Sequence, residues 1–275
     1  MEGNIRTNHE LRLKAFDLLQ EFKVQNTSEQ EIVGRIHNKF GINKVTLSQW
    51  YSGKYKPWGR KGELKIKPDL FYVLGALLGD GCLYRWEITS YYIILSGDNN
   101  FTTKYADAVN LCINTKTKSY PNRGQRIWVV RSNNYKLYSL FKKVREDLSY
   151  LESLIERNGK KSAILFIEGF FDAEGCVKII KEKVRKTPKI CLDITNTNYK
   201  ILELVRRLLK YYLNIQANYS IQKSFIGKDG FKRKKAYHLR IYKKEYIRKF
   251  LENIDTTKLK KEKVPYVKRW LNNGL

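Results

Sequence analysis

Hydrophobic residues along this chain recur first at helical spacing and later in short alternating runs. Between residues 9 and 24 the apolar positions fall every three or four residues, which places them on one face of a helix. The sequence therefore predicts a first helix from about 9 to 24, whose apolar face is formed by Leu11, Ala15, Leu18, Leu19 and Phe22.

Two shorter helices are predicted to follow. Ser28 with Glu31 forms a capping box that opens a helix, and Gly41 ends it. Asn43 can cap a third helix, which Gly53 stops. A helix, a glycine turn and a helix over this length resemble a helix-turn-helix module, with a spacer or a protein-contact unit as the alternative. The third helix is expected to present four polar side chains to DNA, those of Lys44, Thr46, Ser48 and Gln49. Its Val45, Leu47 and Trp50 are expected to face mostly inward.

Beyond a basic, glycine- and proline-containing linker, the order helix, two strands, helix, two strands, helix is predicted twice. The first half has strands at 82–88 and 91–96, a helix at 101–112, strands near 116–121 and at 126–131, and a helix at 135–147. The second half has strands at 176–183 and 189–195, a helix at 199–213, strands at 218–225 and 236–242, and a helix at 245–254. A last helix at about 265–271 has no counterpart. The fold class is therefore α+β, with an all-α unit at 1–52, a linker at 53–67, and halves at 68–160 and 161–275.

Each half is predicted to begin with a helix that ends in the same motif. Residues 73–81 read VLGALLGDG and residues 167–175 read IEGFFDAEG. Small residues lie four apart in each copy, Gly75 and Gly79 in one, Gly169 and Ala173 in the other, so they share a helix face that a second backbone can approach closely. The glycine after the acid is a natural helix stop. The duplication indicates two related halves about a pseudo-twofold axis.

The acid in each copy lies where it is unfavourable. Asp80 and Glu174 fall in the last helical turn, where the helix dipole opposes a negative charge by about 0.3–1 kcal/mol. If the two helices pack together, the carboxylates also repel each other unless a cation lies between them. Two oxygen ligands of this kind suit Mg²⁺, which binds through one or two carboxylates and keeps its waters for a phosphate substrate. The sequence therefore predicts a magnesium site between the two helix ends.

Composition narrows the possible partners. Lys and Arg number 54 against 27 Asp and Glu, a formal net charge of +27, which favours a polyanion and nucleic acid above all. No apolar run approaches ~18 residues and the first residues begin no signal peptide. We therefore expect a soluble protein of the cytoplasm or another intracellular, non-membrane compartment. The four cysteines form no CxxC pair, so they are expected to be small core residues rather than zinc ligands.

The duplicated motif resembles the paired motifs of the LAGLIDADG homing endonucleases in their single-chain form, and the likeness covers roughly residues 68–275. The first copy departs from the family pattern at Leu78, where an acid is usual, but both penultimate acids are present. The resemblance implies two αββαββα halves whose antiparallel sheets form a saddle-shaped surface on double-stranded DNA, in a monomer with internal pseudo-twofold symmetry. It also implies a site-specific endonuclease that makes a double-strand break with a divalent metal.

The resemblance also assigns roles to residues. It implies that Asp80 and Glu174 hold the metal with the carbonyls of Gly79 and Ala173, and that polar and basic helpers surround them. The strand ends after each motif supply Ser96 and Asn196, and the end of the last strand supplies Lys243 or Lys244, with Asn196 and Lys244 chosen as catalytic. The remaining candidates for DNA contact are Lys44, Gln49, Arg85, Ser96, Arg131, Lys178, Lys181, Lys183, Lys223 and Arg240.

Two other functions are compatible with this scaffold. One is an intron-RNA maturase, which would make intron RNA a partner. The other is a transcription regulator that binds DNA without cutting it and without needing a metal. Retention of both acids argues against complete loss of cleavage, because RNA binding alone would not keep two carboxylates together.

Overall fold

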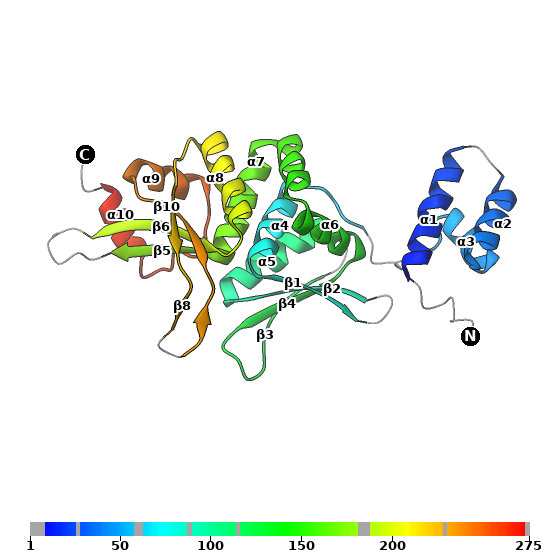
Figure 1. The fold of residues 1–275 in the computed structure, drawn as a ribbon, viewed down its shortest axis with the longest axis horizontal. Helices are drawn as coiled ribbons and strands as arrows, with labels where there is room; N and C mark the ends of the chain where they lie inside the picture. Colours follow the sequence, from blue (N-terminus) through cyan, green and yellow to red (C-terminus); the bar gives the residue numbers. More distant parts are fainter. Residues whose placement is uncertain are drawn as a thin grey trace.

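The protein is described by a computed structural model that covers residues 9–25, 28–57, 63–86, 90–113, 116–180, 188–227 and 230–272. It is built of a three-helix unit followed by two similar halves, each with helices packed on one face of an antiparallel sheet (Figure 1). The predicted α+β class with two pseudo-symmetric halves is confirmed. In the part of the chain that is described, no helix is both long and apolar enough to cross a membrane.

The three-helix unit comprises α1 (His9–Val24), α2 (Glu29–Phe40) and α3 (Lys44–Tyr51). Its helix ends follow the predicted chemistry. The Ser28 side chain accepts from the backbone of Glu31, Gly41 adopts a left-handed conformation with φ of 64°, and the Asn43 side chain caps α3. The unit has a separate hydrophobic cluster centred on Leu19, Ile32, Ile36, Leu47 and Trp50.

The first half contains α4 (Pro68–Asp80), β1 (Gly81–Trp86), β2 (Ser90–Gly97), α5 (Asn99–Cys112), β3 (Ser119–Pro121), β4 (Trp128–Asn133) and α6 (Tyr135–Glu146). Its sheet has the strand order β1-β2-β4-β3, all antiparallel. The chain entering this half is fixed to it, because Leu64 bridges to Ile113 and the Lys65 amide donates to the Cys112 carbonyl at 2.8 Å.

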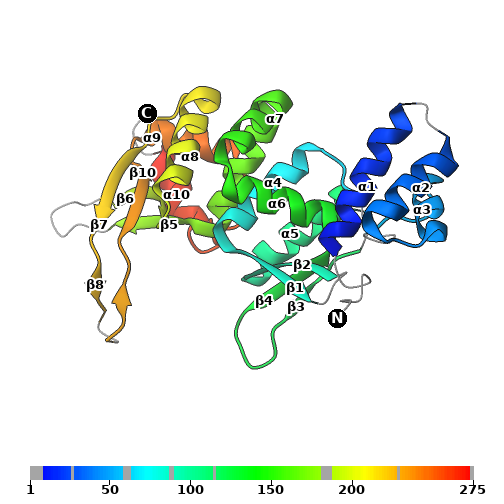
Figure 2. The same cartoon turned by 45° about the vertical axis from the view of Figure 1, so that its right-hand side comes forward.

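The second half repeats this plan with α7 (Leu148–Glu174), β5 (Gly175–Ile180), β6 (Lys189–Asn196), α8 (Tyr199–Leu213), β7 (Asn218–Gln222), β10 (Ala236–Ile241) and α9 (Lys244–Asn253). Its sheet order, β5-β6-β10-β7, matches the first sheet position by position. A two-stranded arm of β8 (Phe225–Ile226) and β9 (Lys232–Arg233) projects beyond it, on the side to which the β3–β4 hairpin also projects (Figures 1 and 2). The chain ends with α10 (Val264–Asn272).

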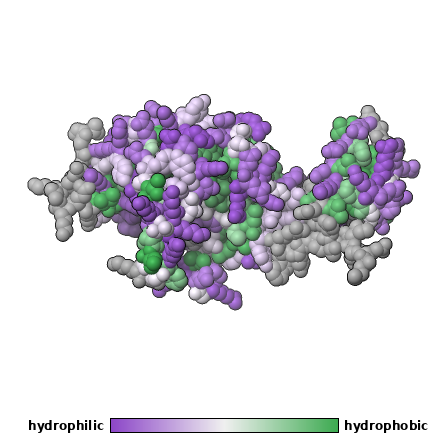
Figure 3. All heavy atoms as spheres, viewed as in Figure 1, coloured by the Kyte–Doolittle hydropathy of each residue, from purple (hydrophilic) through white to green (hydrophobic). Residues whose placement is uncertain are grey.

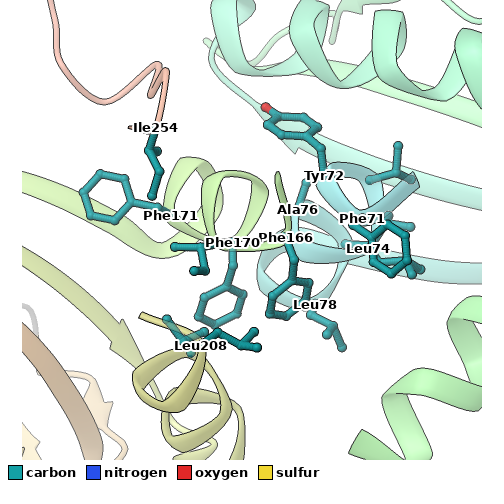
Figure 4. Close-up of a cluster of buried hydrophobic side chains, with 14 of the residues drawn as sticks. Phe71, Tyr72, Leu74, Ala76, Leu78, Phe166, Phe170, Phe171, Leu208 and Ile254 are labelled. Carbon is teal, nitrogen blue, oxygen red and sulfur yellow. The ribbon is translucent and has the colours of Figure 1, made fainter. Parts of the chain in front are cut away.

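Helices α4 and α7 join the two halves into one core. Aromatic and aliphatic side chains of both helices pack in the centre of the molecule, and Leu208 of α8 and Ile254 after α9 complete the cluster (Figure 4). This core is continuous through both halves. The face seen in Figure 3 is largely hydrophilic, as expected for a strongly charged chain.

Several predictions about individual residues were wrong. Val45 was expected to face inward but is 66% exposed, whereas Leu47 and Trp50 are buried as predicted. Cys82 and Cys176 are exposed rather than in the core, because both lie on an edge strand, β1 or β5, on the face that is turned away from the helices; Cys112 and Cys191 are buried. Residues 148–158, predicted to lie between elements, are helical, and Gly159, with φ of 77°, separates them from the motif helix. The proposed domain boundaries at 52, 67 and 160 remain proposals.

Candidate active site at the paired motif helices

The motif helices touch at their small residues. A Cβ atom at Gly75 would overlap the carbonyl oxygen of Phe166 and lie 2.8 Å from the amide nitrogen of Phe170. A Cβ atom at Gly169 would meet the Tyr72 carbonyl in the same way. Each glycine therefore receives the backbone of the facing helix, which is the close approach expected from the four-residue spacing.

The same contact brings the two acids together. Gly79 faces Ala173, and a Cβ atom at Gly79 would lie 3.0 Å from the Cγ of Glu174. Helix α4 ends at Asp80, one residue after Gly79, and α7 ends at Glu174, one residue after Ala173. The glycines that follow have an extended backbone and start β1 and β5. Asp80 and Glu174 therefore lie side by side at the C-terminal ends of α4 and α7, where both sheets begin.

The electrostatics of the pair agree with this geometry. Burial, followed by the charge of Asp80, raises the pKa of Glu174 to about 7, while the Nδ2 of Asn196 donates to its Oε1 at 2.7 Å and opposes the shift. Burial also raises the pKa of Asp80. Asp80 is exposed and Glu174 is half-buried, and two carboxylates that repel each other in this way form a site that a divalent cation would stabilise.

The donor set fits Mg²⁺. It consists of oxygen atoms only, from the carboxylates of Asp80 and Glu174 and from the carbonyls of Gly79 and Ala173 at the unsatisfied helix ends. Across the described ranges, no group of three or more His, Cys, Asp or Glu side chains is placed to hold a metal. A cation between the two acids would accordingly complete its coordination with water and substrate oxygens, as Mg²⁺ usually does.

A cation that the sequence reasoning missed lies near the acids. Lys258, in the segment after α9, acts on both carboxylates and lowers the pKa values of Asp80 and Glu174 against the effect of burial. Its ammonium lies 5.7 Å from the ring centroid of Phe101 at the start of α5. Nothing in the sequence signals this role, because Lys258 is one of several lysines in a segment without hydrophobic periodicity.

Comparison with known protein families finds a match for the second of the two halves. Residues 161–255 match the family model described as LAGLIDADG-like domain. The second half is therefore similar to a LAGLIDADG-like domain. The resemblance drawn from the double motif is thereby confirmed, and the first half repeats the strand order of this domain. The matched residues of the second half include the end of the motif helix with Glu174, the strand that carries Asn196 and helix α9.

Two curated proteins are similar to this chain in sequence. An uncharacterised protein of Methanocaldococcus jannaschii is 26% identical over 268 residues, which are 92% of each chain. The ribonucleoside-diphosphate reductase NrdEB subunit alpha of Bacillus subtilis is 23% identical over 245 residues, which are 77% of this chain but only 22% of the reductase.

Solved structures of the homing endonuclease I-DmoI are also similar to this chain. Mesophilic variants of I-DmoI are 25% identical with a TM-score of 0.48, over 68% of this chain and 95% of theirs. I-DmoI in complex with DNA and Mn is 24% identical with a TM-score of 0.47, over 68% of this chain and 96% of that chain.

On the LAGLIDADG-like half, two predicted DNA contacts share a face with a buried acid. Lys178 on β5 pairs with Cys191, and Arg240 on β10 pairs with Asp193. Cys191 and Asp193 are two apart on β6, so all four side chains point away from the helices. The Asp193 carboxylate is fully buried, accepts from Lys178, and lies 3.4 Å from Nε of Arg240 and 3.1 Å from Nδ1 of His238. Burial would raise the pKa of Asp193, but these cations hold it below its usual range.

In the first half, Arg131 is exposed on β4, with its guanidinium 5.4 Å from the ring centroid of Tyr92. Ser96 is half-buried near the end of β2. The predicted equivalence of Ser96 and Asn196 was wrong, because Gly81 pairs with Leu95 and Gly175 with Ile194, which places Gly97 at the position of Asn196 and Ser96 at that of Thr195. The backbone of Arg85 lies on β1, and its side chain is outside the described part of the chain. The roles of Arg131 and Ser96 remain predictions.

The other candidates are more scattered. Lys223 is exposed between β7 and β8, while Lys181 and Lys183 lie outside the described residues. Lys244 begins α9, with Nζ 5.8 Å from the ring centroid of Trp270. On the N-terminal unit, Lys44 is exposed and Gln49 is half-buried on α3. The catalytic role of Lys244 and the DNA contacts of the other residues remain predictions.

Proposed function

We propose that the protein is a site-specific endonuclease that hydrolyses phosphodiester bonds on both strands of double-stranded DNA with a divalent metal, Mg²⁺ being the best fit. The observation that carries this proposal is the pair of acids at the junction of two similar halves. Asp80 and Glu174 come from matched helix ends, repel each other when no cation is present, and lie where the two sheets begin. One chain supplies both acids, so the active form is a monomer.

The residues of the chain have distinct tasks in this mechanism. Asp80, Glu174 and the carbonyls of Gly79 and Ala173 would hold the metal, which activates water and stabilises the leaving oxygen when it is bound. Asn196 donates to the Glu174 carboxylate at 2.7 Å and would orient it for metal binding. The close helix packing at the glycines keeps the two acids at a fixed separation.

The sheets would bind the DNA. Their faces opposite the helices carry Arg131 in the first half and Lys178 and Arg240 in the second, on strands of the same sheets. Cations on such a face neutralise phosphates, and an arginine or lysine in the major groove can recognise guanine. The net charge of +27 supplies the long-range attraction. We further propose that α1–α3 contact the DNA next to the cleavage site through Lys44 and Gln49.

A cleavage selection tests the proposal. A randomised duplex library is incubated with the protein in Mg²⁺ or in EDTA, and the new ends are sequenced. Recurrent paired breaks are expected in Mg²⁺ alone. The double variant Asp80→Asn, Glu174→Gln should bind DNA but leave it intact, whereas Asp107→Asn, which removes one carboxylate charge at an exposed position of α5, should cut normally. Selective binding by the wild type without breaks would refute the nuclease and favour a DNA-binding regulator.

A further inference from the structure

The segment between α9 and α10, residues 255–263, connects the second half to the first, and we refer to it as the C-terminal strap. At its start, Lys104 of α5 contacts the Asp255 carbonyl and lies 3.8 Å from the Asp255 carboxylate. Further along, the Lys258 ammonium lies near Phe101, also on α5. At its end, Lys263 donates to the Val177 carbonyl at 2.8 Å on β5. The strap therefore passes over the first half and returns to the second.

One buried acid fixes the strap to the motif helix. Asp172 is the acid two residues before Glu174, and its side chain is fully buried. Its Oδ1 accepts from the Thr256 hydroxyl at 2.6 Å and from the Thr257 amide at 2.8 Å, and its Oδ2 accepts from the Tyr72 hydroxyl at 3.0 Å. A buried carboxylate is tolerated only when it is satisfied in this way, and here most of its partners belong to the strap or to α4.

The hydrogen bonds continue from Asp172 to Lys258. The Thr256 hydroxyl, which donates to Asp172, accepts from the Lys258 amide at 3.0 Å. One turn earlier on α7, Glu168 accepts from the Asp255 amide at 3.1 Å and from Lys104 at 2.9 Å. The backbone on both sides of Thr256 is therefore held against the helix that carries the catalytic acid, which fixes where the Lys258 side chain begins.

The two motif copies differ at this point. The position of Asp172 is occupied in the first copy by Leu78, so only the second motif helix can hold a strap. The first half also has Gly97 where the second has Asn196, and glycine has no side chain that could hold the acid. Lys258 lies on the side of the first half: its ammonium is near Phe101, whose ring packs against Gly97 at the end of β2, directly after Ser96.

We infer that Lys258, which belongs to the second half, supplies the positive charge beside the acid of the first half. Asp172 acts as a positioning residue for Lys258, because it holds Thr256, which in turn holds the Lys258 backbone. This inference rests on the proposed endonuclease function. Lys258 would place a positive charge beside Asp80 and the phosphate that Asp80 serves, on the side where no amide equivalent to Asn196 is available. The strand cut by the first half would depend on Lys258 more than the strand cut by the second.

Strand-resolved, single-turnover cleavage of the selected site tests the role of Lys258. Lys258→Ala should slow cleavage of one strand by about 10²-fold and that of the other much less, so that nicked duplex accumulates. DNA affinity should stay within about threefold of the wild type, since one of many charges is lost. Lys258→Arg should restore most of the rate, and Lys260→Ala, the same change at an exposed site two residues further, should have no effect. Equal slowing of both strands by Lys258→Ala would overturn the inference.

A double-mutant cycle tests whether the Asp172–Thr256 connection acts through Lys258. Thr256→Ala removes both hydrogen bonds of the connecting hydroxyl and leaves the buried Asp172 side chain in place, so this variant should fold even if Asp172→Ala does not. It should slow the same strand by about tenfold. Combined with Lys258→Ala, it should cost nothing further. If the rate losses of the two single variants multiplied in the double variant, Thr256 would be only structural and the positioning role would be refuted.

Hydrogen exchange gives a readout that needs neither metal nor DNA. The amides of Thr257 and Lys258 donate to Asp172 and Thr256, so they should be protected in the wild type and should exchange faster in Thr256→Ala and Asp172→Asn. If the wild type cut no DNA but showed this protection, the proposed nuclease would fail while the strap geometry stood. If exchange at the two amides were the same in wild type and variants, the positioning role would fail whether or not the protein cut DNA.

Discussion

Replacing Gly75 with alanine should separate the two motif helices. The new Cβ atom would overlap the Phe166 carbonyl and lie 2.8 Å from the Phe170 nitrogen, whereas carbon atoms pack best at about 3.5–4.0 Å from their neighbours. Both obstacles are backbone atoms of a buried helix, so no side-chain rotation can relieve the contact. The helices must move apart along the centre of the core that joins both halves.

The free energy of unfolding should fall by about 2–3 kcal/mol. Overpacking a buried contact costs typically ~1–3 kcal/mol and more when only backbone can yield, while alanine recovers about 1 kcal/mol of helix propensity over glycine. For a chain of this size the loss corresponds to a fall of about 5–10 °C in the melting temperature of the two-half core. Cleavage should fall as well, because the movement separates Asp80 from Glu174.

Calorimetry and circular dichroism check this expectation, with Gly34→Ala as the matched control. Gly34 lies inside α2 and a Cβ atom there would meet nothing within 4 Å, so the same substitution should stabilise the N-terminal unit by about 0.5–1 kcal/mol. Gly169→Ala should behave like Gly75→Ala, since its Cβ would overlap the Tyr72 carbonyl. If Gly75→Ala melted within about 1 °C of the wild type, the close helix contact would be refuted.

Three further expectations follow from the same structure. Burial and the Asp80 charge raise the pKa of Glu174 from 4.5 to about 7, so the folded state binds this proton more tightly and the metal-free protein should lose stability as pH rises from about 4.5 to 7. In EDTA at pH 8, Glu174→Gln should recover about 1–2 kcal/mol of the free energy of unfolding after solvent screening, and an unchanged melting curve would contradict the repulsion. Asp193→Ala should lower the free energy of unfolding by about 3–5 kcal/mol in a urea titration, because it leaves the cations around a buried carboxylate unpaired; a loss below about 1 kcal/mol would show that the acid does not organise them. Lys44→Ala should weaken DNA binding at all sequences and lower the salt slope of the affinity by about 1 in a filter-binding series, and an unaltered slope would mean that α3 does not touch phosphate.

Most helix ends were predictable because their signals are local. Ser28, Asn43 and the glycine at 41 act through atoms within three or four residues, so their effect does not depend on the rest of the fold. The missed helix at 148–158 also had such a signal: the Asp147 side chain accepts from the amides of Ser149 and Tyr150. Val45 could not be placed this way, because α3 has only eight residues and the packing of α1 and α2 decides which of its sides is covered.

The position of the acids was determined by the sequence alone. Two motif helices with small residues four apart can pack at their backbones only along that face, and the acid directly follows the second small residue in both copies. That argument needs helix geometry and nothing else.

The surroundings of the acids were decided by the tertiary structure. Lys258 reaches them from a strap more than eighty residues after Glu174 in the chain, and it is held there by hydrogen bonds to Asp172. Asp193 collects Lys178, His238 and Arg240 across three strands. Such contacts join residues distant in sequence, and neither periodicity nor spacing encodes them, because they depend on how the two halves and the strap pack.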